Sequence, residues 1–263
     1  MAFFVSKYDT ITNKVIILDL DETLVHTSDN MDILKKLGIL TNPKLMALRS
    51  RIGTVHIDDV LSSRGSGTKS NLWYIKRPYS REFIIFCFAY FRAVLVWSAG
   101  VSKYVKAIVK EEFKNIKPPL VIYTRDQCIA DPVDGDLYKP LSKLLSEVPG
   151  LSKYANIKNT LILDDKAATF RETPDNGVLI PRYSPPFTVS GIMEQDIALL
   201  QFREWLLKPD VISSDDVRTL DKSLIFTTPL AKISKLEATK AGCREDVLGT
   251  TRHSGVPESP RVY

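Results

Sequence analysis

The sequence predicts an α/β fold, in which a parallel sheet is covered by helices on both faces and carries a small insertion after its first strand. Short runs of branched apolar residues alternate along the chain with segments of helical spacing. Each run is apolar almost throughout, as expected for strands that are buried on both faces. Strands that alternate with helices in this way form parallel, Rossmann-like sheets.

Five apolar runs are predicted to be the strands of this sheet. The first run, residues 15–18, is followed by the acids Asp19 and Asp21. The others comprise residues 93–97, 120–124, 160–163 and 178–180. Ligands of open α/β sheets bind beyond the carboxyl ends of the strands, so the polar residues after these runs are the candidates for a functional site.

Segments with helical spacing of apolar residues separate the strands. Pro78 lies shortly before the first of these segments, where a first-turn proline is favoured. The predicted helices comprise residues 81–91, 103–113, 138–148 and 193–207. They provide the cover that a sheet buried on both faces requires.

The block between the first strand and the first of these helices is predicted to be an insertion. Residues 27–71 lack the alternation of apolar and polar residues that marks a strand. Two short helices are predicted at residues 31–40 and 45–52, and a flexible, glycine-containing loop at residues 64–68.

The chain is predicted to have one domain and an extension. The domain covers residues 1–210, with the insertion at about 28–72. Residues 211–263 form the C-terminal extension, which we expect to be largely disordered after about residue 227, where small and polar residues dominate.

Composition restricts the function classes only broadly. A formal charge of +5 and a pI near 8.9 suit an anionic substrate but are too weak to indicate nucleic acid. Cys87, Cys128 and Cys243 are far apart and form no C-x-x-C pair, which argues against a disulfide framework or a zinc site. No signal peptide or membrane span is predicted. We therefore expect a soluble intracellular protein, nuclear or cytoplasmic.

The acids after the first strand predict a metal site. Asp19 and Asp21 lie on the same side of an extended chain, because side chains alternate along a strand. Two carboxylates that close repel each other unless a cation lies between them, and Mg²⁺ is a suitable hard cation. The alternative is an acidic turn after a buried strand.

Further strand ends and loops supply groups that complement these acids. Ser98, with the small residues Ala99 and Gly100, follows the second strand, and Lys139 lies in a later loop. Asp164 and Asp165 follow the strand at residues 160–163. Carboxylates bind a metal, a hydroxyl and backbone amides bind phosphate oxygens, and a lysine neutralises charge. Together these groups indicate phosphoryl transfer.

The stretch Asp19-Leu20-Asp21-Glu22-Thr23-Leu24-Val25-His26 resembles the signature of the haloacid dehalogenase superfamily. More narrowly, the chain is similar to the phosphatases of the RNA polymerase II carboxy-terminal domain, also called the NLI-interacting-factor-like family. The similarity covers residues 14–207, and its further motifs are Ile75-Lys76-Arg77-Pro78, Val96-Trp97-Ser98-Ala99-Gly100, Tyr138-Lys139-Pro140-Leu141-Ser142 and Leu161-Ile162-Leu163-Asp164-Asp165.

The resemblance implies the following roles. Asp19 would be the nucleophile that forms an aspartyl-phosphate, and it would also bind the metal. Asp21 would protonate the departing oxygen and later deprotonate water, while its backbone carbonyl reaches Mg²⁺. Ser98, where the family usually has threonine, would bind phosphate together with Ala99, and Lys139 would contact the transferred phosphoryl group. The alternatives are a nucleophile that only binds metal, a turn aspartate and a surface lysine.

The acids of the last motif and the outer residues are assigned by the same resemblance. Asp165, where small family members often have asparagine, would bind Mg²⁺, and Asp164 would pair with Lys139, although the two acids could exchange roles. Val101, Tyr104 and Arg125 match the substrate-binding region of the family. Helix packing or a solvated charge would explain these three equally well.

The function implied is that of a Mg²⁺-dependent protein serine/threonine phosphatase, with the phosphorylated polymerase repeat as the favoured substrate. The expected partner is therefore a phosphoprotein, and neither nucleic acid nor membrane is expected to bind. The alternatives are a small-molecule phosphatase or phosphotransferase of the superfamily, and a catalytically inactive binding module. The absence of a large cap favours a macromolecular substrate. The partly helical, basic insertion departs from the β-rich insert of the small polymerase phosphatases, and the compact form also resembles family members of large DNA viruses.

Overall fold

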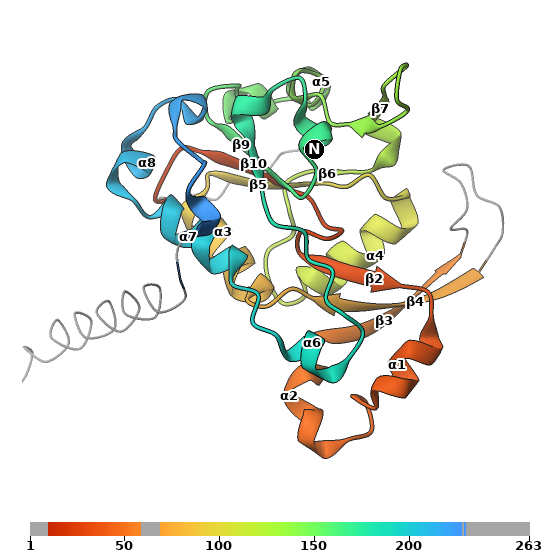
Figure 1. The fold of residues 1–263 in the computed structure, drawn as a ribbon. Coiled ribbons are helices and arrows are strands. Elements are labelled where there is room, and N and C mark those ends of the chain that lie inside the picture. Colours follow the sequence, from red (N-terminus) through yellow and green to blue (C-terminus); the bar gives the residue numbers. More distant parts are fainter. Residues whose placement is uncertain (1–9, 59–68, 228, 230–263) are drawn as a thin grey trace, which may run out of the picture. The chain divides into compact units, whose positions relative to one another are not determined.

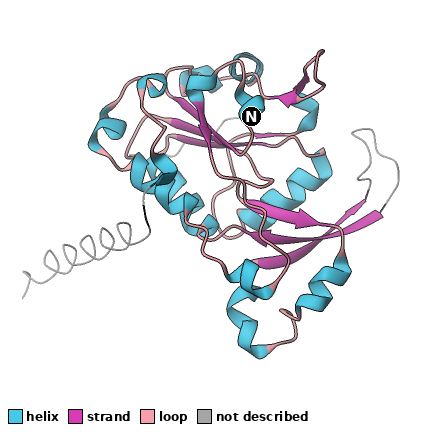
Figure 2. Ribbon diagram, in the orientation of Figure 1, coloured by secondary structure: helices cyan, strands magenta, loops and turns pink. Residues whose placement is uncertain are grey.

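The computed structural model describes residues 10–58, 69–227 and 229. Its central sheet has five parallel strands in the order β10-β9-β1-β5-β6 (Figures 1 and 2). These strands are β1 (Val15–Leu18), β5 (Ala93–Trp97), β6 (Ile122–Tyr123), β9 (Thr160–Asp164) and β10 (Gly177–Leu179). The predicted α/β fold is confirmed, and each predicted apolar run contributes one strand.

Alternate residues of the central strands point to opposite faces, and both faces are covered. Ile16 and Leu18 of β1 lie in a core with side chains of α3, α4 and α7, whereas Val15 and Ile17 lie in a second core with α5. The helices are α3 (Ser80–Tyr90), α4 (Ser102–Glu112), α5 (Leu141–Glu147) and α7 (Ala198–Leu206). Burial on both sides explains why these strands are apolar throughout.

The insertion is a lobe, residues 25–76, built on a three-stranded antiparallel sheet in the order β2-β4-β3. Its elements are β2 (Val25–Ser28), α1 (Met31–Leu37), α2 (Met46–Arg49), β3 (Ile52–Asp58) and β4 (Lys69–Lys76). The expectation that residues 27–71 lack strands is therefore wrong, and the two helices are shorter than predicted. The predicted loop at residues 64–68 lies outside the described residues.

The missing alternation in β3 has a packing cause. A Cβ at Gly53 would collide with the ring of Tyr74 on the paired strand β4, so an apolar side chain is replaced by a partner's ring. Only Ile52, Val55 and Ile57 of β3 are buried. The apolar positions are therefore too few and too irregular to mark a strand in the sequence.

Arg51 ties the insertion lobe to the C-terminal part of the domain. Its Nη2 donates a 2.6 Å hydrogen bond to the Tyr183 hydroxyl, and its Nη1 donates to the Ile192 carbonyl at 3.2 Å. Tyr183 in turn donates its backbone N–H to the Glu22 carbonyl at 2.7 Å. The lobe is thus fixed to the segment that follows β1.

Two predicted helices have different bounds in the structure. The helix predicted at residues 193–207 begins later, as α7, whereas Met193 ends a separate helix, α6 (Val189–Met193). Just before α7, the carboxylate of Asp196 accepts the Ala198 N–H at 3.1 Å and pairs with Arg77 at 2.8 Å. The helix predicted at residues 138–148 starts after Pro140, since the preceding residues pair as strand β8 (Leu137–Tyr138) with β7 (Ile129–Ala130).

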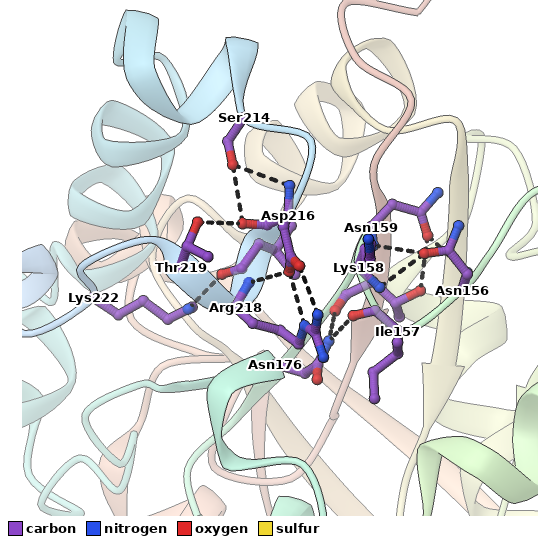
Figure 3. A network of polar contacts seen from close by, with 12 residues as sticks. Asn156, Ile157, Lys158, Asn159, Asn176, Ser214, Asp216, Arg218, Thr219 and Lys222 are labelled. Atoms are coloured by element: carbon purple, nitrogen blue, oxygen red, sulfur yellow. Dashed lines mark hydrogen bonds and ion pairs between the residues drawn. The ribbon is translucent and has the colours of Figure 1, made fainter.

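Residues after α7 also pack on the sheet domain. The side chains of Val211 in α8 (Pro209–Ser213), of Val217 and of Ile225 are buried in the core with α3 and α7. Figure 3 shows a polar network in this region, in which Arg218 forms a 2.7 Å ion pair with Asp216. The domain boundary predicted at residue 210 remains a prediction.

A second unit, residues 227–263, lies almost entirely outside the described part of the chain, as do the predicted disorder and Cys243. Cys87 and Cys128, which are described, are free thiols. Within residues 10–58 and 69–227, no helix has the length and the apolar composition needed to cross a membrane.

Candidate active site

Three neighbouring strands bring the predicted site residues together. β1 lies between β9 and β5 in the sheet, and all three strands run in the same direction. Asp19 therefore emerges beside Asp164, the last residue of β9, and beside Ser98, which follows β5. The carboxyl edge of a parallel sheet is where such side chains can converge on one ligand.

Lys139 lies between two of the carboxylates. Its Nζ is 2.6 Å from Asp19 Oδ1 and 2.6 Å from Asp164 Oδ2, and all three side chains are buried. Burial alone would lower the pKa of Lys139, but the carboxylates of Asp164 and Asp19 outweigh it and raise that pKa. The lysine is therefore held as a cation within a charge-assisted hydrogen-bond pair.

A third acid completes a group that could hold a metal ion. Among the described residues, Asp19, Asp164 and Asp165 each offer a carboxylate oxygen, and these oxygens lie within 4.8 Å of one another. Asp165 Oδ2 is buried without a hydrogen-bond partner in the described part of the chain. Burial and the neighbouring Asp164 raise the pKa of Asp165. A buried carboxylate oxygen without a donor is the observation that a cation here would explain.

These donors fit Mg²⁺, which prefers carboxylate oxygens and water. The predicted ligand set differs from this group in two respects, since it included Asp21 and preferred Asp165 to Asp164. In the structure Asp164 belongs to the group as well as pairing with Lys139. The roles of the individual acids stay predictions.

The carboxylate of Asp21 points to other partners. The hydroxyl of Tyr104 donates to Asp21 Oδ1 in a short hydrogen bond and also lies 3.1 Å from Thr27 Oγ1. Ser98 Oγ donates to Asp21 Oδ2 at 3.2 Å. Burial raises the pKa of Asp21, while the hydrogen bonds from Tyr104 and Ser98 lower it. A carboxyl whose pKa is raised toward neutrality is suited to general acid–base catalysis.

The turn after β5, predicted to bind phosphate, is held by hydrogen bonds to its own residues. Ser98 Oγ accepts the Gly100 N–H at 3.0 Å, and a Cβ at Gly100 would press on the Tyr104 ring. The chain then enters α4 at Val101, which is buried. Arg125 is exposed, and its Nε donates to the carbonyl of Ala99 at 2.8 Å. The exposed Arg125 side chain thus stabilises this turn through a hydrogen bond to its backbone.

Two of the residues predicted to bind substrate, Val101 and Tyr104, are buried. Val101 and Tyr104 are both 7% exposed, and the Tyr104 hydroxyl is committed to Asp21, so neither presents an open surface to a peptide. The predicted substrate role of these residues, and of Arg125, stays a prediction.

Two residues near the site, Glu22 and Arg182, were not predicted from the sequence. Glu22 Oε1 pairs with His26 Nδ1 at 2.8 Å, while Glu22 Oε2 is 3.5 Å from Arg182 Nε. Arg182 Nη1 also lies 4.0 Å from Asp165 Oδ2, and its side chain is 58% exposed. The signal in the sequence that could have identified Arg182 is its position just after β10, the strand next to β9 in the sheet.

Two comparisons by sequence identify relatives. A family model described as NLI interacting factor-like phosphatase matches residues 14–218. The Caenorhabditis elegans protein named CTD small phosphatase-like protein 1 is 26% identical over 167 residues, which cover 63% of this chain. This chain spans 26% of the length of that relative.

Two solved structures are also similar in fold. The structure of Fcp1, described as an essential RNA polymerase II CTD phosphatase, gives a TM-score of 0.48 at 15% identity and covers 92% of this chain and 67% of that one. A fission yeast Fcp1 variant bound to beryllium fluoride gives 0.47 at 14% identity, covering 92% and 68%.

The family match includes every residue placed at the site, from Asp19 to Arg182, and it confirms the resemblance found in the sequence. The chain belongs to the NLI interacting factor-like phosphatase family.

Proposed function

We propose that this protein is a Mg²⁺-dependent protein serine/threonine phosphatase that acts through an aspartyl-phosphate on Asp19. The observation that carries the proposal is the position of Lys139, which is buried between Asp19 and Asp164 and lies beside the three-carboxylate group. A nucleophile, a fixed cation and a set of metal donors within one buried cluster are what transfer of a phosphoryl group requires.

In the first half-reaction, Asp19 attacks the phosphorus atom. Lys139 holds Oδ1 of Asp19 at 2.6 Å, which leaves Oδ2 as the attacking oxygen. The new O–P bond forms as the bond between phosphorus and the serine oxygen breaks. Asp21, whose pKa is raised by burial, donates its proton to the departing oxygen.

In the second half-reaction, water hydrolyses the aspartyl-phosphate. Asp21, now ionised, takes a proton from the water, and the O–P bond to Asp19 breaks to regenerate the carboxylate. The Ser98 hydroxyl, which in the structure hydrogen-bonds to Asp21, exchanges that bond for a phosphoryl oxygen. Mg²⁺ bound by Asp19, Asp164 and Asp165 would supply a Lewis acid that neutralises charge on the phosphoryl oxygens.

Two features support a protein substrate, with the phosphorylated polymerase repeat as the favoured one. The relative from Caenorhabditis elegans carries the name of a CTD phosphatase-like protein. The insertion lobe also begins at the site, because Thr27 on β2 lies 3.1 Å from the hydroxyl of Tyr104. A peptide bound at Asp19 would therefore meet the lobe.

The first experiment measures hydrolysis of an aryl phosphate with and without Mg²⁺ by the wild type and by Asp19→Asn. This substitution keeps the size of the side chain and removes the nucleophilic oxygen. We expect Mg²⁺-dependent turnover by the wild type alone. Equal background rates for both proteins would refute an enzymatic function and favour the binding-module alternative.

A second measurement addresses the substrate class. The kcat/KM values for phosphoserine and phosphothreonine peptides, including the polymerase repeat, are compared with those for sugar phosphates. We expect the peptides to be preferred, because the insertion lobe offers contacts that a small molecule does not reach. A clear preference for sugar phosphates would favour the small-molecule alternative.

A further inference from the structure

The segment that carries Lys139 is an exposed hairpin with an acidic tip. Strands β7 (Ile129–Ala130) and β8 (Leu137–Tyr138) pair in antiparallel register, and Lys139 follows β8 directly. We call residues 129–138 the acidic hairpin, because its turn contains Asp131, Asp134 and Asp136. Strands of two residues give little stability of their own, so side-chain contacts must hold this hairpin in place.

One cation holds the tip. Arg171 Nη1 lies 2.6 Å from Asp131 Oδ2 and 3.2 Å from Asp134 Oδ2, and Arg171 Nη2 lies 3.7 Å from Asp136 Oδ2. The same guanidinium lies 5.7 Å from the centre of the Tyr138 ring. Arg171 thus contacts both the turn and the strand that leads into Lys139, and it supplies the positive charge that three close acids need.

Arg171 belongs to the segment that also carries the acids of the site. Asp164 ends β9, and the short 3₁₀ turn Ala167–Phe170 leads from there to Arg171. Within that turn, the carbonyl of Thr169 accepts the backbone N–H of Lys139 at 2.6 Å. The Nζ of Lys139 reaches back to Asp164 at 2.6 Å. The two segments are therefore joined at the hairpin tip, at the backbone of Lys139 and at its ammonium group.

We propose that Arg171 is a positioning residue. Its ion pairs with the acidic hairpin fix the position of the Lys139 ammonium group. The proposal rests on the function proposed above, in which Lys139 is the fixed cation that holds the nucleophile Asp19. Without Arg171, the three acids at the tip would lose the counterion that contacts all of them, and the hairpin would lose the side-chain contact that joins its turn to the segment after β9. A displacement of about 1 Å in a catalytic group can lower a rate by roughly 100-fold.

The chain provides a matched control in Arg218. Its ion pair with Asp216 is 2.7 Å long, and the two side chains are 35% and 22% exposed, compared with 28% and 21% for Arg171 and Asp131. The Arg218 pair belongs to the network of Figure 3, and none of the residues labelled there is a site residue. Loss of either arginine removes a surface ion pair of similar length and exposure, but only Arg171 contacts the hairpin that leads to Lys139.

The test compares Arg171→Gln, Arg171→Lys and Arg218→Gln in aryl phosphate hydrolysis. We expect Arg171→Gln to lower kcat by between about 10- and 100-fold with little change in KM. Arg171→Lys should recover part of kcat, because it keeps the charge but loses the planar fork. Arg218→Gln should match the wild type. A kcat of Arg171→Gln within twofold of wild type, or an equal loss in Arg218→Gln, would overturn the proposal.

Hydrogen exchange separates this proposal from the proposed function. The amide of Lys139 is bonded to the Thr169 carbonyl, so Arg171→Gln should accelerate exchange in the peptide that covers residues 137–139, and Arg218→Gln should not. If the wild type had no phosphatase activity, the proposed function would be wrong. Faster exchange in Arg171→Gln would still support the proposal that Arg171 holds the acidic hairpin in place. Unchanged exchange in Arg171→Gln would refute the proposed role of Arg171, whether or not the wild type is an active phosphatase.

Discussion

Replacing Lys139 with methionine removes the cation between Asp19 and Asp164 and keeps most of the side-chain volume. Both ion pairs are 2.6 Å long and buried, so the variant leaves two carboxylates without their counterion. Removing one partner of a buried pair costs about 3–5 kcal/mol of the free energy of unfolding. Because each kcal/mol lowers the Tm of a domain of this size by about 2–4 °C, we expect a decrease of roughly 6–20 °C near pH 8.

The decrease in Tm caused by Lys139→Met should depend on pH. Burial already raises the pKa of Asp19 well above its usual range, although Lys139 opposes the shift. Without the ammonium group this pKa rises further. A carboxyl with a higher pKa in the folded state binds protons on folding, so its cost is complete above the folded-state pKa and is relieved as the pH falls toward the unfolded value of about 4. The Tm deficit of Lys139→Met should therefore be smaller at pH 5 than at pH 8.

Thermal unfolding followed by calorimetry at both pH values measures this deficit. Lys143→Met is the control, because the Lys143 ammonium donates to the Gln127 carbonyl at 3.0 Å and not to a carboxylate. Its Tm should change little, and equally at both pH values. A deficit of Lys139→Met that is the same at pH 5 and pH 8, or no larger than that of Lys143→Met, would refute the reasoning.

Two further predictions concern the surroundings of the site. Tyr104→Phe removes a hydrogen bond that lowers the pKa of Asp21, so the pH–rate profile should move to higher pH; an unshifted profile would contradict the acid–base role of Asp21. Arg182→Gln removes a half-exposed cation 4.0 Å from Asp165 Oδ2, so calorimetric titration should show Mg²⁺ binding tighter by up to about fivefold. Weaker or unchanged binding would show that Arg182 does not compete with the metal.

The sheet and the core of the site could be predicted because they depend on local pattern. Strands buried on both faces must be apolar throughout, and the run at residues 93–97 coincides with β5. The parallel direction of the strands then puts Asp19, Ser98 and Asp164 at one edge. Residue order along the chain was therefore enough to predict that these three residues lie at the same edge of the sheet.

The parts that were missed depend on contacts between distant segments. At Gly53 the Tyr74 ring fills the space of an apolar side chain, and the last predicted helix starts late, after Asp196, which pairs with the distant Arg77. The hydrogen bond from Tyr104 to Asp21 joins α4 to the loop after β1. No local periodicity records such contacts, since a side chain's partner across the fold leaves no trace in its own sequence neighbourhood.

The two ends of the insertion lobe lie side by side. Val25, where the chain enters the lobe, pairs with Lys76, where it leaves, and the next residue, Arg77, donates its N–H to the Leu24 carbonyl at 2.8 Å. Because the two ends are hydrogen-bonded to each other, the lobe can change in length away from them without changing the distance between the points where the chain enters and leaves it. The surface of the lobe can therefore vary while the sheet edge that carries Asp19 stays the same.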